Sequence, residues 1–405
     1  MKIMYIQYAG DFAEAYDRLI TAGGEENYYG QRYSVEAVLR QVRAGHRVVV
    51  LTLTAPRGER VLEPDLVAVG LGGGPDIDHG RVAACLDAWS PERVVLRLPD
   101  ARLLHSLHRR GIETFPVFAD SFERRGLQPR GRWQDWRLGR ALRLPNVRWV
   151  ANHQLNAARS LARLGVDPAR ILPYDWEHPD RPENWRKAVP EDLTQRPLRL
   201  FYAGGLDPDK GLDDLLAAVA WLERAGRVVE LTIAGRGDER ALARRLGRLA
   251  LRSRVAYAGV IPHRAVLAGM HHADLVVVPS RHAYPEGLPM TIMEGLMVHT
   301  PVIASDHPMF VGRVGGRGAV RFFPERDPQA LAQTVLAVCD DPARYRRMCE
   351  AAPLEWHDLV LPLKWGDMID AWLEDVAAPA LAHHSLAALD ERAGPTLPAG
   401  AMQPV

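Results

Sequence analysis

Short apolar runs alternate with amphipathic stretches along most of this chain, and the alternating pattern occurs twice. Strands that alternate with helices are typical of a parallel β-sheet with helices on both faces. A chain of 405 residues also exceeds the usual size of one hydrophobic core. The expected fold class is therefore α/β, with two doubly wound, Rossmann-like parallel-sheet domains.

The first alternating series lies before residue 175. Its expected strands are residues 3–8, 47–53, 66–69, 94–98, 115–118 and 147–150, and its expected helices include 34–44, 81–89 and 103–110. The second series begins at Leu198, with expected strands at 198–202, 229–233, 255–258, 275–278 and 302–304. Ligands of parallel sheets bind beyond the carboxyl ends of the strands, so functional residues are expected in the loops after these strands.

Residues 175–197, which are rich in Pro, Trp and charge, separate the two series and are predicted to be the interdomain linker. We expect an N-terminal domain over residues 1–190 and a C-terminal domain over residues 191–354. A helical segment is expected over residues 355–378, which contain three tryptophans. Residues 379–405 are rich in Ala and Pro, show little periodicity and are expected to form a mobile tail.

The composition argues against several classes of protein. A formal net charge of +1 gives no overall field for nucleic acid, so no nucleic-acid partner is expected. The three cysteines have neither metal-ligand spacing nor a disulfide framework, and the N-terminus lacks the layout of a signal peptide. No apolar run reaches membrane-spanning length. We therefore expect a cytoplasmic protein, with peripheral contact at the inner membrane face as an open alternative.

Residues 285–294 combine two carboxylates eight positions apart, Glu286 and Glu294, with a Gly-Leu-Pro turn between them. An apolar run at 275–278 precedes them, so a strand would lead into the N-terminus of a helix. The free N–H groups of a helix N-terminus favour phosphate, and carboxylates accept hydrogen bonds from hydroxyls. Phosphate together with several hydroxyls describes a nucleotide sugar. The alternative is that Glu286 only favours the helix start and that Glu294 is solvated.

A second turn, residues 203–211, follows the first strand of the second series and carries Lys210, one of only four lysines in the chain. An ammonium at this place would lie over bound phosphates, and we favour this role over that of a surface lysine in a helix-capping turn. Asp207 and Asp209 have the spacing of a divalent-metal site, but two acids in a polar turn are more often helix caps. No metal site is predicted.

Three further turns of a similar kind follow expected strands. They contain Gly23 and Gly24, then Gly235 and Arg236, and then Val260 and Ile261. Glycine lets the backbone approach a ligand closely. A single Gly-x-Gly turn is weak evidence, however, and each of these segments is also compatible with an ordinary loop.

These pieces give the second half of the chain a resemblance to the retaining glycosyltransferases of the GT-B fold, in particular to their family 4 (glycosyl transferases group 1). The matching parts are residues 210–211, 235–237, 279–280, 286–294 and 302–306, in that order. In the first half, residues 23–24 and 45–48 are similar to the family's glycine loop and second strand. The resemblance covers residues 1–375 and implies two domains that face a cleft, with a C-terminal helix that returns to the first domain.

The resemblance implies transfer of a sugar from a nucleotide-diphosphate sugar to a hydroxyl group, with retention of the anomeric configuration. Catalytic roles are implied for Glu286 at the sugar ring, Lys210 at the diphosphate, and Asp120, while Glu294 would hold the ribose. The implied donor-binding residues are Gly23, Gly24, Gly204, Gly205, Lys210, Gly235, Arg236, Val260, Ile261, Glu286, Gly287, Leu288, Pro289, Met290 and Glu294. No cofactor is implied beyond this co-substrate, for which a UDP-sugar is expected and a GDP-sugar is the alternative.

The chain departs from the family pattern at three places. Gly205 stands where the family usually has an arginine, and Ala119 replaces a histidine near the donor sugar, which leaves Asp120 as the polar group. Asp175 and Trp176 replace an Asn-Gly turn. One diphosphate contact is therefore either missing or supplied by Arg281, Arg313 or Arg317. A sugar-nucleotide epimerase of the same fold and a non-catalytic nucleotide-sugar-binding protein remain as alternatives.

The acceptor is expected on the first domain, as a glycan, a lipid-linked molecule or a small molecule. The candidate contacts are Glu25, Glu26, Asn27, Asn152 and His153, each of which is also compatible with an ordinary surface position. Residues 124–148 are rich in arginine and contain Trp133 and Trp136. Such a mixture is able to hold a helix at an anionic membrane, and a solvated face is the alternative.

Overall fold

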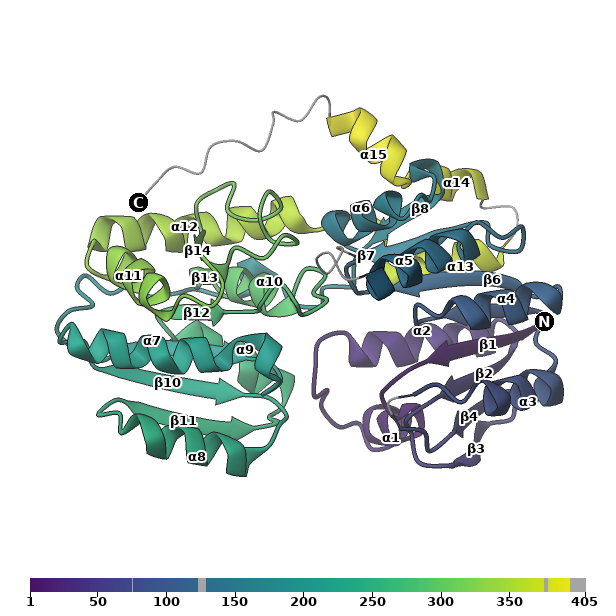
Figure 1. The fold of residues 1–405 in the computed structure, drawn as a ribbon, viewed down its shortest axis with the longest axis horizontal. Helices are drawn as coiled ribbons and strands as arrows, with labels where there is room; N and C mark the ends of the chain where they lie inside the picture. The colour runs from purple at the N-terminus through teal and green to yellow at the C-terminus, as the bar shows by residue number, and fades with distance from the viewer. Residues whose placement is uncertain (75, 123–128, 375–377, 394–405) are drawn as a thin grey trace. The chain divides into compact units, whose positions relative to one another are not determined.

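The computed structural model describes residues 1–74, 76–122, 129–374 and 378–393. Contacts divide the chain into two compact units, each built around one β-sheet (Figure 1). Unit 1 comprises Met1–Glu26, Gly30–Glu177 and Leu361–Val405, and unit 2 comprises Asn27–Tyr29 and His178–Val360. The chain therefore crosses from unit 1 to unit 2 and returns.

Unit 1 contains an eight-stranded sheet with the order β3-β4-β2-β1-β5-β6-β7-β8. Its strands are β1 (Lys2–Gln7), β2 (Arg47–Thr52), β3 (Gly58–Glu63), β4 (Leu66–Gly70), β5 (Arg93–Leu96), β6 (Glu113–Phe118), β7 (Val150–His153) and β8 (Ile171–Tyr174). Its α-helices are α1 (Phe12–Tyr16), α2 (Gln31–Arg43), α3 (His79–Trp89), α4 (Ala101–Arg109), α5 (Pro129–Ala141), α6 (Leu155–Arg163), α13 (Trp365–Leu373), α14 (Ala378–Ala382) and α15 (Leu386–Ala393). Neighbouring strands are parallel, apart from the antiparallel pair β3 and β4.

Helices cover both faces of this sheet. Along β1, Met4 and Ile6 join a core that includes residues of α3, α4, α5, α6 and α15. Ile3 and Tyr5 join a second core with residues of α1, α2, α13 and α14. Successive side chains of a strand point to opposite faces, so four buried apolar residues in a row are the sign of a strand covered on both sides.

Unit 2 contains a six-stranded, parallel sheet with the order β11-β10-β9-β12-β13-β14. Its strands are β9 (Leu198–Ala203), β10 (Val229–Ala234), β11 (Arg254–Gly259), β12 (Leu275–Val278), β13 (Val302–Ser305) and β14 (Val320–Phe323). Its α-helices are α7 (Leu212–Arg224), α8 (Glu239–Leu249), α9 (His263–His272), α10 (Met290–Met297), α11 (Pro328–Cys339) and α12 (Pro342–Leu359). Buried residues of β9, β10 and β12 share one core with residues of α7, α11 and α12.

The two alternating series of the sequence therefore correspond to two parallel sheets, and the predicted fold class is confirmed. The exceptions have local causes. The predicted strand at 147–150 starts only at Val150. Strand β3 is missed because its residues are mostly exposed at an antiparallel sheet edge and form no apolar run. Strands β8 and β14 are short, and each contains a residue that interrupts the apolar pattern, Pro173 and Arg321 respectively.

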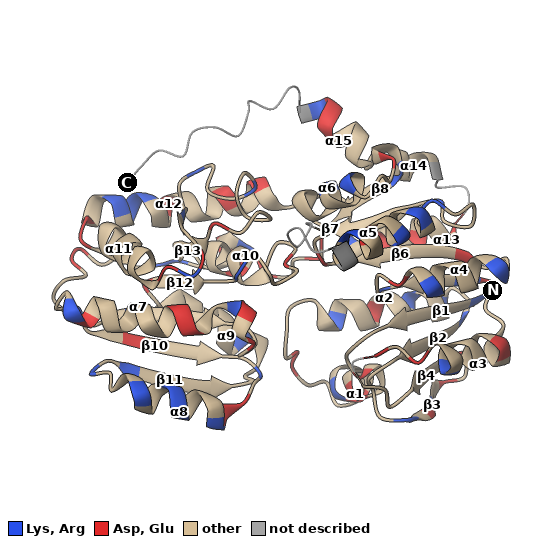
Figure 2. Ribbon diagram, viewed as in Figure 1, with Lys and Arg blue, Asp and Glu red and all other residues tan. Residues whose placement is uncertain are grey.

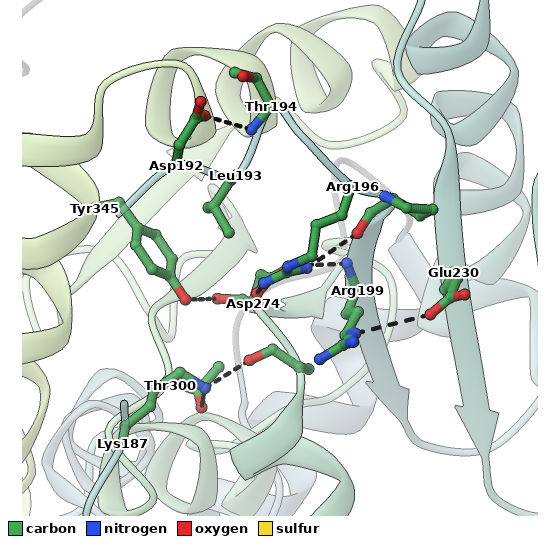
Figure 3. Close-up of polar contacts among 12 residues, drawn as sticks. Lys187, Asp192, Leu193, Thr194, Arg196, Arg199, Glu230, Asp274, Thr300 and Tyr345 are labelled. Carbon is green, nitrogen blue, oxygen red and sulfur yellow. Dashed lines mark hydrogen bonds and ion pairs between the residues drawn. The ribbon is translucent and has the colours of Figure 1, made fainter. Parts of the chain in front are cut away.

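The contacts place the boundary between the units after residue 177, earlier than the predicted boundary after residue 190. Much of the predicted linker packs onto unit 2 (Figure 3). Lys187 Nζ donates to two main-chain carbonyls at 2.5 and 2.6 Å and to Thr300 Oγ1 at 2.9 Å, and burial lowers the pKa of Lys187 to about 8. Arg196 donates two hydrogen bonds to the Asp274 carboxylate at 2.7 and 2.8 Å. These partly buried polar contacts hold the segment against unit 2.

The chain returns to unit 1 at Leu361, where it lies beside Asp175. The fully buried Asp175 carboxylate accepts a hydrogen bond from Leu361 N at 3.0 Å, and Trp365 N donates to Asp175 O at 2.8 Å. Helix α13 follows and buries Trp365 and Trp372 in the core of unit 1. A C-terminal helix thus returns to the first sheet, as the resemblance implied. The predicted helix over residues 355–378 is instead two helices, because α12 ends with unit 2 at Leu359.

The first part of the predicted mobile tail is folded, which corrects that expectation. Helices α14 and α15 occupy residues 378–393, with Leu381 and Leu386 buried in the two cores of unit 1. Arg159 on α6 pairs with Asp390 on α15 at 2.7 Å. Two buried leucines in an Ala-rich stretch give too weak a periodicity for a sequence-based prediction. Residues 394–405 of the predicted tail lie outside the described residues.

Candidate active site at the sheet edge of unit 2

The turn after β9 brings Lys210 to the carboxyl edge of the second sheet. A short 3-10 helix, Pro208–Lys210, ends at Gly211, whose φ of 74° lies in the left-handed region. A β-carbon at Gly211 would lie 1.9 Å from Pro279 O, so only glycine allows the turn to pass this close to the end of β12. The close approach places Lys210 beside the segment that follows β12.

Lys210 and Glu286, which are 76 residues apart in the sequence, form an ion pair. Lys210 Nζ lies 2.5 Å from Glu286 Oε1 and 4.1 Å from the ring centroid of Tyr284. The same carboxylate oxygen accepts a hydrogen bond from Ser280 Oγ at 2.7 Å. The Lys210 side chain keeps 19% of its surface exposed, against 8% for Glu286. The Lys210 side chain is therefore the more accessible member of the pair.

The loop between β12 and α10 is held in place on the side of the Lys210 turn. Arg281 N donates to Asp209 O at 2.8 Å, and the Arg281 guanidinium makes a two-pronged contact with Asp214, with both hydrogen bonds at 2.9 Å. Asp214 lies in the first turn of α7. The contacts of Arg281 fix the backbone that carries Ser280 and Glu286, so the position of the carboxylate is defined by two neighbouring elements.

Glu294 lies within α10 and is 5% exposed. Its Oε1 contacts Nε2 of His263 at 2.8 Å, and His263 is the first residue of α9. The ring of Tyr29 packs edge-on against His263 with centroids 5.4 Å apart, and residues 27–29 belong to unit 2. Glu294 therefore has one oxygen oriented by a histidine, which leaves the second oxygen for another partner.

The other second-half residues that were predicted to bind the donor lie along the same edge of the sheet. Gly204 N donates to Ala234 O at 2.9 Å, and Tyr202 Oη donates to Gly205 O at 2.6 Å, so both glycines lie in a firmly bonded turn. A β-carbon at Gly235 would lie 1.9 Å from Gly204 O, which requires glycine where these two turns touch. Arg236, Val260 and Ile261 follow the ends of β10 and β11, and Val260 is 49% exposed.

Helix α10 begins at Met290, with Pro289 as its N-cap residue. Gly287 and Leu288 are buried just before this helix start. Thr291 Oγ1 donates to Ala203 O at 3.1 Å and so joins the first turn of α10 to the end of β9. The structure thus brings the helix start to the Lys210 turn, within unit 2.

The residues predicted in the first half lie at the carboxyl ends of unit 1 strands or in the loop before α2. In that loop, Gly24 O accepts a hydrogen bond from Arg32 at 2.7 Å, and Glu26 Oε2 accepts one from Arg32 N at 2.9 Å. Gly23, with a φ of 64°, and Glu25 are exposed. Asn27 belongs with unit 2. The loop is ordered by Arg32. Its predicted residues 23–26 belong to unit 1, whereas Lys210 belongs to unit 2.

Asp120 is exposed directly after β6. Asn152, at the end of β7, is fully buried; its amide donates to Asp120 O and Ala157 O, and its oxygen accepts from His153 N. These bonds give Asn152 a structural role in the strand-to-helix turn. His153 is 3% exposed, with Nε2 3.6 Å from Asp175 Oδ1. Of these three residues, Asp120 is the most accessible to a ligand.

The three arginines considered as substitutes for the family arginine at position 205 are engaged elsewhere. Arg281 binds Asp214, as described above. Arg313 donates to Leu359 O at 2.6 Å, and Arg317 makes a two-pronged contact with Asp358 at 2.6 and 3.0 Å. Arg281 is the one of the three whose main chain also contacts the Lys210 turn, so its use for a diphosphate would require release from Asp214.

Sequence reasoning did not assign site roles to Ser280, Tyr284 or His263. Each contacts a predicted residue through the fold: Ser280 and Tyr284 lie beside Glu286 and Lys210, and His263 lies beside Glu294. The Pro279-Ser280 pair carried a signal, since it directly follows β12. The contact between His263 and Glu294 spans 31 residues and two helices, and no local pattern indicates it.

His307 supports the loop that carries Glu286, and it should make the stability of the fold depend on pH in the acid range. Its Nε2 donates to Tyr284 O at 3.0 Å and its Nδ1 accepts from Met309 N at 3.2 Å, which defines a neutral ring. Burial lowers the pKa of His307, partly opposed by the bond to Tyr284 and by Glu286. Unfolding allows the ring to take up a proton at higher pH, so the free energy of unfolding should fall as pH drops below about 6.5.

We expect a His307→Gln variant to lose part of this acid destabilisation. The measurement is the urea unfolding free energy at about pH 7.5 and about pH 5.5, where one unit of pKa difference corresponds to about 1.4 kcal/mol. The same substitution at the exposed His272 is the matched control. An equal pH dependence in the wild-type protein and the His307→Gln variant would contradict this account.

Among the described residues, no group of three or more His, Cys, Asp or Glu side chains is arranged to hold a metal ion. A search of the same residues finds no helix with both the length and the hydropathy needed to cross a bilayer.

Comparison with solved structures identifies the class of fold: the chain has the GT-B fold of glycosyltransferases. Sucrose-phosphate synthase from Thermosynechococcus elongatus superposes with a TM-score of 0.66 at 19% identity, over 94% of this chain and 100% of that one. HepE from Anabaena in complex with UDP-glucose superposes with a TM-score of 0.60 at 15% identity, over 94% and 100% of the two chains.

A family model also matches part of the sequence. Residues 183–355, which are less than half of the chain, match the model of the family "Glycosyl transferases group 1". The match spans nearly the whole of unit 2 and contains Lys210, Glu286 and Glu294. The match confirms the resemblance to glycosyl transferases group 1 that the sequence indicated.

Several proteins with similar sequences are named as glycosyltransferases or as a glycogen synthase. Alpha-D-kanosaminyltransferase from Streptomyces kanamyceticus is 34% identical over 169 residues, which are 40% of this chain and 42% of that protein. Glycogen synthase from Mycobacterium tuberculosis (strain ATCC 25618 / H37Rv) is 34% identical over 38% of this chain and 37% of that protein. The alignments with these relatives thus span about two fifths of their length. A GDP-mannose-dependent alpha-(1-6)-phosphatidylinositol dimannoside mannosyltransferase from M. tuberculosis (strain ATCC 25177 / H37Ra) is 26% identical over 76% and 82% of the two chains.

Proposed function

We propose that this protein is a retaining glycosyltransferase that moves a sugar from a nucleotide-diphosphate sugar to a hydroxyl group of a glycan, a lipid-linked molecule or a small molecule. The observation that carries the proposal is the pairing of Lys210 with Glu286 at the sheet edge, next to the start of α10 and within the segment that matches the family. Neither a sugar-nucleotide epimerase nor a non-catalytic binding protein is favoured by the relatives.

The arrangement suits an anionic diphosphate next to a polar sugar. Lys210 would exchange part of its contact with Glu286 for the diphosphate, and the N–H groups of Gly287 and Leu288 would add donors at the helix start. Glu286 would then accept hydrogen bonds from the donor sugar. Glu294, with Oε1 held by His263, would bind the ribose hydroxyls through its second oxygen.

In the reaction, the bond between the anomeric carbon and the diphosphate oxygen breaks, and a bond from that carbon to the acceptor oxygen forms on the same face. The acceptor proton passes to an oxygen of the leaving diphosphate. The negative charge that develops on the diphosphate is the charge that Lys210 and the helix start stabilise, and electrostatic stabilisation of this kind commonly contributes more to catalysis than any other single effect. Asp120, exposed at the end of β6, is proposed as the polar group on the acceptor side.

The donor is proposed to be a UDP-sugar, with a GDP-sugar as the alternative. HepE is a neighbour in complex with UDP-glucose, whereas the mannosyltransferase relative is named for GDP-mannose. We propose an acceptor of polysaccharide, glycolipid or natural-product glycoside synthesis. Among the relatives, one is named a glycogen synthase and another a phosphatidylinositol dimannoside mannosyltransferase, which supports the first two classes. We place the protein in the cytoplasm, where nucleotide sugars are available, with peripheral contact to a membrane.

The test is a melting-temperature screen of the full chain with UDP, GDP and their sugars. A ligand that binds only the folded protein stabilises it by about 2.7 kcal/mol at a concentration of 100 times Kd, so a matching donor should raise Tm clearly. NMR of the product then shows whether the anomeric configuration is retained. Conversion of the donor to an epimeric nucleotide sugar without acceptor would instead show an epimerase. Binding of the donor without hydrolysis or transfer across an acceptor panel would show a binding protein.

A further inference from the structure

The outer face of α5 in unit 1 combines exposed tryptophans with arginines. Trp133 and Trp136 are each 56% exposed, the largest exposure among the described tryptophans. Arg137 lies over the Trp133 ring at 4.6 Å, and Arg140 lies over the Trp136 ring at 5.0 Å. The four residues are spaced i, i+3, i+4 and i+7, so they form one stripe along the helix. The opposite side of α5 is buried through Leu138 and Ala141.

Helix α4 packs beside α5 and carries further arginines (Figure 2). Arg102 and Arg109 are exposed on α4. Burial lowers the pKa of the nearby His105, and the neighbouring basic groups Arg137, Arg109, His108 and Arg140 lower it further. Asp135 is the single acid of α5. Within the described part of the chain, Arg102, Arg109, Arg137 and Arg140 form no ion pair with a carboxylate.

We propose that the surface formed by Trp133, Trp136, Arg137 and Arg140 on α5, with Arg102 and Arg109 on α4, binds the surface of an anionic membrane. An indole has an apolar body and one N–H group, and such rings settle at the boundary between acyl chains and headgroups. Guanidinium groups around them meet lipid phosphates, to which a planar fork of donors is well matched. The cation–π pairs keep each arginine next to a ring, so that phosphate contacts by the guanidinium and apolar contacts by the indole are made together.

A membrane explains this surface better than a nucleic acid does. Two tryptophans with more than half of their surface in water are a considerable apolar exposure, and burying them in an interface recovers free energy that phosphate contacts alone do not provide. The inference deepens the proposed function, because a lipid-linked acceptor lies in a membrane. It does not depend on the donor site, which belongs to unit 2, so binding and transfer are measured separately.

The experiment is co-sedimentation of the full chain with vesicles of phosphatidylcholine alone or of phosphatidylcholine with phosphatidylglycerol, without nucleotide sugar. We expect binding to the anionic vesicles only, and weaker binding as salt is raised. The double variant Arg137→Gln/Arg140→Gln should lower the partition coefficient by roughly tenfold or more, given about 1 kcal/mol for each basic residue near the surface. Trp133→Ala/Trp136→Ala should lower it by a similar factor, because it removes apolar area that enters the interface.

Trp221 and Arg224 on α7 of unit 2 provide a matched control, since they form the same kind of pair at 4.9 Å with Trp221 38% exposed. Trp221→Ala/Arg224→Gln should leave vesicle binding unchanged, and circular dichroism with thermal melting confirms that all variants fold. Equal binding to both vesicle types, an equal loss in the control variant, or tighter binding to single-stranded RNA than to the anionic vesicles would overturn the inference. If the wild-type protein binds the anionic vesicles but transfers no sugar, that result would count against the proposed function and not against membrane binding.

Discussion

Replacement of Lys210 by methionine is expected to lower kcat for sugar transfer by roughly 10²–10³-fold, because catalysis of this kind loses that factor when one stabilising group is removed from the developing charge. Lys210 is the more exposed member of the ion pair with Glu286, and only three other lysines occur in the chain, at positions 2, 187 and 364. Methionine keeps most of the length of the side chain and removes the charge. Steady-state kinetics with the donor found in the melting-temperature screen provide the measurement.

Two variants separate charge from shape in this experiment. Lys210→Arg retains a positive charge near Glu286 and should recover part of the activity. Lys2→Met removes an exposed lysine at the start of β1 and should leave kcat unchanged. Glu286 would be left without its cation in the Lys210→Met variant, so thermal melting is needed to show that the fold persists. A folded Lys210→Met protein with wild-type kcat would remove Lys210 from the proposed mechanism.

Glu294→Gln should weaken UDP or GDP binding by about tenfold to a hundredfold, which corresponds to about 1.5–3 kcal/mol for hydrogen bonds that involve a charged group. The reason is that the carboxylate is buried within α10 and oriented by His263 at 2.8 Å, so its second oxygen would meet the ribose in a fixed position. The dissociation constant is measured by isothermal titration calorimetry with the nucleoside diphosphate.

Inorganic pyrophosphate is the matched ligand for this prediction, because it lacks the ribose. Glu294→Gln should leave pyrophosphate binding unchanged, whereas Lys210→Met should weaken both ligands. His263→Gln should weaken the nucleotide less than Glu294→Gln does, since the acid remains and only its orientation is lost. If Glu294→Gln weakened pyrophosphate as much as the nucleotide, the acid would be acting on the phosphates or on the fold, and the ribose assignment would be abandoned.

The fold is largely readable from the sequence because parallel strands buried on both faces leave unbroken apolar runs, as in Met4–Ile6 of β1 or Val276–Val278 of β12. Strand β3 escapes this reading because it is an exposed antiparallel edge. The return of α13 and α15 to unit 1 depends on contacts between the two ends of the chain, such as that of Arg93 with the carbonyls of Trp372 and Leu373, and no local pattern carries this information.

Only part of the candidate site can be predicted from the sequence, because the rest depends on contacts between distant residues. Lys210 and Glu286 each follow a strand, so the sequence places both at the same sheet edge, and their ion pair is the outcome of β9 and β12 being neighbours in the sheet. The roles of His263 and Ser280 depend on the packing of side chains, which spacing does not determine. The role of Asn152 was also not readable, because a polar residue at a strand end is as well suited to a buried turn as to a ligand.

The return of the chain to unit 1 has a consequence for synthesis on the ribosome. Residues 178–360 are contiguous, so this part of unit 2 is ready to fold once residue 360 has emerged. The sheet of unit 1 is complete at Tyr174, yet Trp365, Met368 and Trp372, which cover one of its faces, are made about 200 residues later. At about 5–20 residues per second that delay is roughly 10–40 s. During this interval a nascent chain leaves uncovered the part of this face that α13 later covers, around Tyr5 and Phe115, and chaperones would act there.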